Sequence, residues 1–279
     1  MCLCLASSLH SWAQVDISAY FLENHGFDTN FNYDARQTGN VSGDVINEVY
    51  GWTNETTATY TVAGTFAYNP EVTFNNSSAL PASGYEGSEG GALGLTTGWG
   101  MQLVYSQSVT LPKGTYRLSS AYYNVGTSSA GNSLLAWLPD NGTATVSNVK
   151  NFPVKSWKTD ELIFTLTAQT TGKIRIGFAA NEGVGSANHA KILVDYVKLL
   201  CDEMDKGNLE TALSEARAAY GDGSGVYAEE LKAAIDEAQT VYEDEHAAVT
   251  DILASTQRLT EATPVSYTHL RAHETDQYL

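Results

Sequence analysis

The alternation of apolar and polar residues is the feature that most constrains the fold of this chain. Segments 161–168 and 173–178 place an apolar residue at every second position. A period of two is typical of a β-strand with one buried face. The link Thr170–Thr171–Gly172 predicts a hairpin between them. Further strands are predicted at 115–123 and 191–200, so we expect a mainly β protein built as an antiparallel β-sandwich.

The spacing of apolar residues changes after residue 204. Apolar residues recur at helical spacing in three stretches, around Leu213, Leu231 and Ile252. Residues 202–264 carry 15 acidic and 4 basic residues, a net charge of −11. We therefore expect the β-sandwich to cover residues 14–201. Residues 202–264 should form a small bundle of three α-helices with their acidic side chains in solvent.

The charge of the whole chain limits its partners. The formal net charge is −17 at pH 7, so nucleic acids and anionic lipid surfaces are poor partners. No apolar run reaches the roughly 18 residues that a membrane helix needs. We expect a monomer without a transmembrane segment.

The beginning of the chain predicts export. The stretch MCLCLASSLHSWAQ is apolar and ends near a small-x-small cleavage site. We interpret residues 1–13 as the remnant of a signal peptide, with a first β-strand as the alternative. Cys2 and Cys4 would leave with that peptide, and Cys201 would remain without an intrachain partner. The protein is then expected to be secreted or on the cell surface.

The end of the chain raises the question of a metal site. His269 and His273 stand four residues apart, a spacing that would place both on one side of a helix. However, Val265–Thr275 back-translates into a sequence that resembles the transposon-end adapter of DNA library preparation. We therefore interpret residues 265–279 as an artefactual tail. The third helix is expected to stop at Thr263, and the natural chain to continue into a further domain.

The position of one carboxylate in the β region needs a chemical explanation. Asp195 lies in the strand register of Val197, so alternation places it on the same face. A buried carboxylate is costly unless it is hydrogen-bonded or bound to a cation. If the first and last strands pair, Asn24 and Asp28 come close to Asp195, and the three suit a structural Ca²⁺. Two alternatives stay open: Asp195 accepts backbone N–H bonds, or the face of Tyr196 is the buried one.

Four stretches of the β region resemble a galactose-binding-domain-like jelly roll. They are the opening ISAYFLENHGFD, the LPKGTYRLS hairpin, the run from Trp157 to Thr167 and the closing ILVDYVKLL. The resemblance covers about Val15–Leu200. It implies a carbohydrate-binding module of the kind found in secreted bacterial glycan-processing proteins, several of which carry a structural calcium near the module's ends. The helical part resembles the small three-helix FIVAR-type modules of bacterial surface proteins.

Motifs for catalysis are absent from the sequence. It contains no HExxH, GxSxG or P-loop motif. Glu86 and Glu89 lie in the glycine-rich segment GYEGSEGG, and a glycosidase needs two carboxyl groups at a set separation. A solvated loop is the simpler interpretation of these two acids.

Sugar binding on a β-sandwich needs aromatic faces for sugar C–H groups and polar side chains for hydroxyls. Six residues have suitable chemistry: Trp99, Tyr85, Trp137, Asn124, Trp52 and Tyr122. Trp99 lies between two glycines, so we expect it to be the main stacking platform, with Tyr85 and Trp137 next. Each aromatic has a core residue as its alternative interpretation, and Trp157 and Tyr116 are expected in the core.

These observations predict a non-catalytic carbohydrate-binding module with a helical spacer, from a larger secreted bacterial protein that targets glycans. The first alternative is an architectural or protein-interaction domain without a sugar site. The second is a fragment of a glycoside hydrolase or polysaccharide lyase. An exposed aromatic pair beside a polar groove would favour the binding module. A smooth polar surface would favour the interaction domain, and clustered carboxylates in a cleft would favour the enzyme.

Overall fold

The structure is a computed structural model with two compact units, one formed by Asp16–Leu200 and the other by the remaining residues. It describes residues 14–32, 39–41, 45–56, 62–74, 79–97, 102–126, 131–147, 152–180, 190–221, 223 and 228–276. The predicted signal-peptide remnant lies outside the described residues. The units are described separately below.

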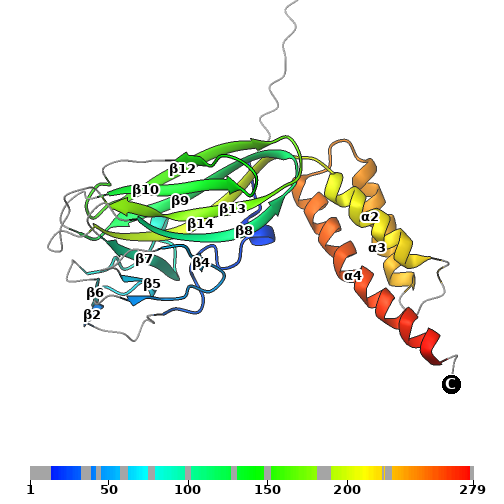
Figure 1. The fold of residues 1–279 in the computed structure, drawn as a ribbon, viewed down its shortest axis with the longest axis horizontal. Helices are drawn as coiled ribbons and strands as arrows, with labels where there is room; N and C mark the ends of the chain where they lie inside the picture. Colours follow the sequence, from blue (N-terminus) through cyan, green and yellow to red (C-terminus); the bar gives the residue numbers. More distant parts are fainter. Residues whose placement is uncertain are drawn as a thin grey trace, which may run out of the picture. The chain divides into compact units, whose positions relative to one another are not determined.

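Two antiparallel sheets dominate the first unit (Figure 1). The first sheet has the spatial order β12 (Trp157–Leu166), β9 (Gly114–Asn124), β14 (Ala190–Met204), β7 (Gly91–Thr97), β5 (Val62–Ala67) and β3 (Val45–Ile46), and β1 (Val15–Asp16) pairs with β14. The second sheet has the order β11 (Thr145–Ser147), β10 (Gly131–Pro139), β13 (Thr170–Ala180), β8 (Gln102–Leu111) and β4 (Thr53–Asn54).

Smaller elements lie outside these ladders. They are β2 (Gly39–Val41), which pairs in parallel with β6 (Val72–Phe74), the helix α1 (Ser18–Phe21) and the 3-10 helix η1 (Tyr85–Gly87). The pair β3–β5 is also parallel. The mainly β, antiparallel sandwich expected from the sequence is confirmed.

The sandwich core explains why the alternating segments fold as they do. Along β12, Leu162, Phe164 and Leu166 are buried, whereas the residues between them are exposed. Phe164 stacks on Tyr116 of β9 and on Trp137 of the opposing sheet, with ring centroids 5.5 Å and 5.1 Å apart. Because Trp137 lies on β10, this contact identifies the face of β12 and β9 that points between the sheets. We call these three rings the inner core.

The predicted hairpins are wrong, because consecutive strands here lie in different sheets. Thr170, Thr171 and Gly172 already belong to β13, which pairs with β10 and β8, while β12 pairs with β9. The LPKG stretch likewise joins β8 to β9 across the sandwich. Alternation of apolar and polar residues shows that one face of a strand is buried. It does not show whether the next strand pairs with it in the same sheet or faces it from the opposite sheet, because both arrangements give the same alternation.

The second unit contains three helices that run side by side: α2 (Gly207–Tyr220), α3 (Ala228–Glu243) and α4 (Val249–Asp276) (Figure 1). Their buried residues form one cluster that includes Leu209, Leu213, Leu231, Ile235, Ile252 and Leu259. These are the apolar positions that recur at helical spacing in the sequence. No described helix has the length and apolarity to cross a membrane.

The end of α4 corrects one expectation. The helix does not stop at Thr263 but extends to Asp276. It passes Pro264, whose missing N–H removes one bond from the helix interior. Residues 265–276 are rich in residues that tolerate a helix, so sequence composition does not oppose its extension. The likeness of 265–275 to an adapter concerns the origin of these residues and stays a prediction.

Lys206 joins the start of the helical unit to its middle helix. Its ammonium group donates hydrogen bonds to the backbone carbonyls of Val241 (3.0 Å), Tyr242 (2.9 Å) and Asp244. The last carbonyls of a helix have no partner within the helix, and a cation there also suits the helix dipole. Lys206 therefore caps the end of α3.

Candidate ligand-binding site

A cavity of 200 Å³ lies on the first unit, lined by residues of the segments 25–28, 85–89 and 195–198. We call it the outer cavity. The first segment follows α1, the second contains η1, and the third belongs to β14. Three parts of the chain that are far apart in sequence therefore meet at one place. The expected pairing of first and last strands is observed, since β1 pairs with β14.

An irregularity in β14 places two neighbouring side chains in the outer cavity. Asp195 and Tyr196 both line it, whereas regular alternation would send them to opposite faces. Val194 before them and Val197 after them are both fully buried. We infer a β-bulge at Asp195–Tyr196, which shifts the alternation of inward and outward side chains along the strand by one residue. Asp195 is buried, as are Val197 and Leu199, whereas Tyr196 and Lys198 between them are half-buried, so the carboxylate is buried as the sequence predicted.

Asp195 is a buried carboxylate that is held by three donors. Tyr68 donates its hydroxyl hydrogen to Oδ1, Ser88 donates to Oδ2 at 3.0 Å, and the backbone N–H of Tyr85 donates to Oδ2 at 3.2 Å. Burial raises the pKa of the Asp195 carboxyl above its ordinary value of 3.8, and these hydrogen bonds oppose the rise. The carboxylate thus fixes the loop that carries Tyr85 to the sheet.

The glycine-rich sequence GYEGSEGG makes this close approach possible. A Cβ atom at Gly84 would overlap both the Asp195 carboxyl and the Ser88 hydroxyl. The backbone N–H of Gly84 donates to the carbonyl of Ser88 at 2.8 Å, so the loop closes on itself. Any residue with a side chain at position 84 would push the loop away from Asp195.

Tyr85 and four further aromatic rings form one cluster, of which Tyr85 and Tyr196 line the outer cavity. Tyr85 meets Trp157 at 6.3 Å and 73°, and Tyr196 at 6.1 Å and 58°. Trp157 also contacts Tyr123 at 5.2 Å and Tyr68 at 6.3 Å. All five rings are half-buried, so each keeps some ring surface in solvent. We call them the outer aromatic cluster.

Charged groups gather around the outer cavity. Asp28, Glu86, Glu89 and Asp195 line it together with one cation, Lys198. Asp28 keeps more solvent contact than Asp195, yet loss of solvent on one side raises its pKa, and the charge of Asp195 acts in the same direction. The Lys198 ammonium lies 4.5 Å from the centre of the Tyr196 ring, a cation–π distance. The charged side chains of the site are thus predominantly acidic.

The structure places only one of the six predicted sugar-binding residues at this cavity, Tyr85. Trp99 lies outside the described residues, so its role stays a prediction. The other four are buried: Trp137 is 2% exposed, Trp52 is 5%, and Tyr122 and Asn124 are 0%. Trp137, Tyr122 and Asn124 are packing residues, which corrects their assignment as ligand contacts, whereas Trp52 also lines a second groove of the first unit.

Physical neighbours explain these corrections. Trp137 stacks on Phe164 at an interplanar angle of 6°, and Tyr122 stacks on Phe152 at 5.1 Å. Trp52 packs against Phe27 at 5.6 Å, and its indole N–H donates to the carbonyl of Asn24. These side chains help to exclude water from the core, and among them Trp52 also reaches a surface groove.

Sequence reasoning missed Tyr196, and it assigned Trp157 to the core, where the half-buried ring does pack against a core cluster while also contacting Tyr85. Trp157 begins β12 at an odd position, whereas the buried positions of that strand are even. That parity was readable from the sequence and places Trp157 on the face opposite to Phe164. Tyr196 had no such signal, because the bulge that turns it outward follows from tertiary contacts.

The predicted calcium ligands are only partly brought together. Asp28 and Asp195 line the same cavity, but the Asn24 side chain is engaged elsewhere. Its Nδ2 donates to the carbonyl of Tyr50 at 3.0 Å, and its Oδ1 accepts from Thr29. Both oxygens of Asp195 face hydrogen-bond donors, which do not fit a cation site. The surroundings of Asp195 match the alternative in which its carboxylate is satisfied by hydrogen bonds. Calcium binding stays a prediction. Among the described side chains, no group of three or more His, Cys, Asp or Glu is placed to hold a metal ion.

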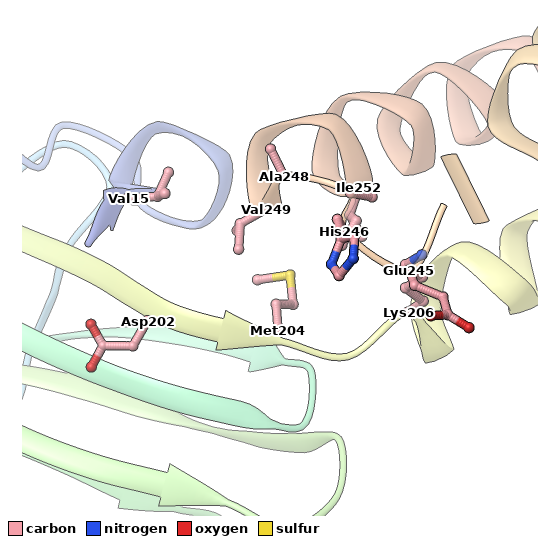
Figure 2. A pocket seen from close by; sticks show the side chains of 10 residues that line it. Val15, Asp202, Met204, Lys206, Glu245, His246, Ala248, Val249 and Ile252 are labelled. Carbon is pink, nitrogen blue, oxygen red and sulfur yellow. The ribbon is translucent and has the colours of Figure 1, made fainter. Parts of the chain in front are cut away.

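A larger cavity of 410 Å³ lies in the second unit and has different chemistry (Figure 2). Val15, Met204, Val249 and Ile252 supply an apolar lining, and Glu245 and His246 come from the connection between α3 and α4. None of the residues that line it is aromatic apart from the imidazole of His246. It lacks the ring surface that a sugar needs, so the outer cavity is the better candidate.

The sequence was compared with known families and proteins, and the structure with solved structures. No protein-family model matches, and no curated protein is similar. TmCBM61 in complex with β-1,4-galactotriose is similar at 19% identity over 64% of this chain and 95% of that chain, with a TM-score of 0.39. The CBM22-1 xylan-binding domain of Xyn10C from Paenibacillus barcinonensis gives 13% identity, coverages of 65% and 94% and a TM-score of 0.38.

A third solved structure adds to this group. The family 11 carbohydrate-binding module from Clostridium thermocellum, in complex with a β-1,3-1,4-mixed-linked tetrasaccharide, gives 17% identity, coverages of 55% and 89% and a TM-score of 0.31. At such low identities and TM-scores, the three likenesses carry no argument about the function of this chain. The proposal below therefore rests on the geometry of the outer cavity.

Proposed function

We propose that residues 14–201 form a non-catalytic carbohydrate-binding module, and that the helical unit is a spacer in a larger exported bacterial protein. One observation carries the proposal: the half-exposed pair Tyr85 and Tyr196 stands beside a polar cavity. An exposed aromatic pair next to polar groups is the feature that separates a sugar-binding module from an interaction domain with a smooth polar surface.

The chemistry of sugars explains why this arrangement matters. A sugar ring has an apolar C–H face and hydroxyl groups that are well hydrated in water, so binding needs ring surface and preorganised polar partners together. Tyr85 and Tyr196 supply ring surface, Glu86 and Glu89 supply acceptors, and the Lys198 ammonium supplies a donor. The volume of 200 Å³ is below the roughly 300–1,000 Å³ of drug-sized ligand pockets. It suits one sugar ring.

Preorganisation supports the same conclusion. The backbone of Tyr85 is fixed by Asp195 and by the turn between Gly84 and Ser88, so little entropy is lost when a ligand orders the ring. Millimolar to micromolar affinity is expected, about −4 to −8 kcal/mol.

The experiment compares the wild-type chain with Tyr85→Ala on a glycan array. It then uses native gels that contain soluble galactan, xylan or mixed-linkage β-glucan. We expect the wild type to be retained by at least one glycan and Tyr85→Ala to lose that retention. Tyr20→Ala is the matched control, because Tyr20 is also exposed, at 41%, and does not line the outer cavity. Absence of retention on every glycan would contradict the proposal.

Hydrolysis is a second candidate because four carboxyl groups line one cavity. The three donors on Asp195 argue against it, since they hold that carboxylate in a structural role. Incubation with the retained glycan decides between the two functions. Release of reducing ends that Glu86→Gln abolishes would establish a hydrolase, and retention without release would establish a binding module.

A further inference from the structure

An open groove of 830 Å³ lies next to the outer cavity, lined by Asn30 and residues 47–54. We call it the Tyr50 groove. Its most exposed large side chain is Tyr50, with 54% of its surface in solvent. Only a few large apolar or aromatic side chains among the described residues are this exposed. A tyrosine ring in water at the edge of a groove therefore needs an explanation.

The turn that carries Tyr50 is rigid. The backbone N–H of Trp52 donates to the carbonyl of Val49 at 2.9 Å, which closes a β-turn with Tyr50 and Gly51 at its centre. Gly51 has a φ of +78°, and a Cβ there would lie 2.8 Å from the Glu23 side chain. Asn24 also holds the turn, since its Nδ2 donates to the carbonyl of Tyr50. The ring of Tyr50 is thus exposed and preorganised.

The lining of the groove indicates the class of ligand. Asn30, Asn54 and Thr53 are exposed and carry amide or hydroxyl groups, and Glu48 adds one carboxylate. As far as the structure describes the groove, its lining has no Lys, Arg or His. An anionic ligand would find no cation there, whereas a neutral ligand rich in hydroxyl groups would find both amide partners and a ring face.

The segment Glu23–Asp28 contacts residues of both the groove and the outer cavity. His25, Gly26 and Asp28 line the outer cavity, while Asn24 holds the Tyr50 turn. Phe27 packs on Trp52 at 5.6 Å, which ties the same segment to the groove. The sites of Tyr85 and Tyr50 are therefore connected through contacts of one ordered segment.

We propose that the Tyr50 groove is a second subsite for neutral glycans, so that the β-sandwich binds a stretch of a polysaccharide chain and not a single sugar. This inference rests on the proposed function and deepens it. Two linked subsites make the second contact intramolecular, so a ligand that reaches both binds tighter than one that reaches either alone. Affinity should therefore rise with chain length until both subsites are filled.

The test titrates the full chain with trisaccharides and hexasaccharides of galactan, xylan and mixed-linkage β-glucan by calorimetry. We expect a hexasaccharide to bind the wild type roughly tenfold tighter than the trisaccharide of the same glycan. Tyr50→Ala should remove this gain and leave trisaccharide affinity unchanged. Tyr50→Phe should keep the gain, because it preserves the ring. Tyr85→Ala should weaken both ligands, and Tyr20→Ala should behave as the wild type.

The outcomes separate this inference from the proposed function. If Tyr50→Ala keeps the wild-type ratio of affinities while Tyr85→Ala loses binding, the second subsite is overturned and the binding module stands. If no variant differs from a wild type that binds glycan, both site assignments are overturned. If the wild type binds none of the six oligosaccharides, the inference is overturned, and the glycan array decides the proposed function separately.

Amide chemical shifts give a readout that does not depend on any variant. The hexasaccharide should shift the signals of residues 47–54 and 85–89, and the trisaccharide only those of 85–89. Shifts confined to 85–89 with both ligands would overturn the second subsite.

Discussion

The two faces of the strand pair β9–β12 carry aromatic clusters that differ in what covers them. On one face, the inner core of Tyr116, Phe164 and Trp137 is sealed by the opposing sheet. On the other, Tyr123 and Trp157 belong to the outer aromatic cluster, whose rings are half-buried and pack against a second core cluster that includes Phe66 and Leu193. The same residue types therefore stabilise the fold on one face and remain open to a ligand on the other.

The largest expected effect comes from the inner core. Trp137→Ala removes a ring that is 2% exposed and stacked on Phe164, so it leaves a cavity between the sheets. We expect the free energy of unfolding to fall by about 3–5 kcal/mol. Urea denaturation of the variant and the wild type measures this difference. A loss below about 1 kcal/mol would show that Trp137 does not anchor the core.

The same substitution on the outer face should separate binding from stability. Trp157 is half-buried, so Trp157→Ala should cost only about 1–2 kcal/mol of stability. It removes the ring that supports Tyr85, and we expect glycan affinity to fall by roughly tenfold or more. Gel retention and urea denaturation on one protein batch test both effects. Unchanged retention together with a core-sized stability loss would break the comparison between the faces.

Acidity should sharpen the comparison at the outer cavity. The pKa of Asp195 in the folded protein is raised above its ordinary 3.8, so the folded state takes up a proton more readily than the unfolded chain. Lowering the pH through the raised value towards 3.8 should therefore increase the stability of the wild type relative to Asp195→Asn. Melting temperatures of both proteins across this range measure the difference. If the difference in melting temperature between the two proteins stays constant with pH, or shifts in favour of Asp195→Asn as the pH falls, the raised pKa of Asp195 is contradicted.

Calcium removal is the smallest expected effect. The sequence-based calcium prediction requires a chelator to lower the melting temperature of the wild type. The donors around Asp195 predict no change instead, and this is the result that we expect. A drop in the wild type that Asp195→Ala abolishes would establish a calcium ion at the outer cavity.

The sequence was sufficient for the class of fold and for the apolar stripes of the helices. Alternation in β12 and β13 and helical spacing around Leu213 and Leu231 depend on local burial, which sequence pattern reports directly. The pairing of strands was not predictable in this way. The link at 167–169, between β12 and β13, crosses between sheets, and a local pattern carries no information about the partner of a strand.

The candidate site was less predictable than the fold. The turn after Trp137 suggested exposure, but Trp137 lies on β10 and points into the inner core. Trp157 was assigned to the core, although its strand parity places it outside. Exposure of an aromatic ring depends on which loop or sheet lies over it, and that is a property of tertiary structure.

The bulge in β14 also restricts how this surface can change. One extra residue at Asp195–Tyr196 lets Val194 and Val197 both stay buried while Asp195 and Tyr196 face the outer cavity. Deleting either residue would shift the rest of the strand by one position and turn buried positions such as Leu199 towards solvent. Substitutions can alter the chemistry of the cavity one side chain at a time. A change in chain length at this point is instead opposed by the whole hydrophobic core, which protects the shape of the site.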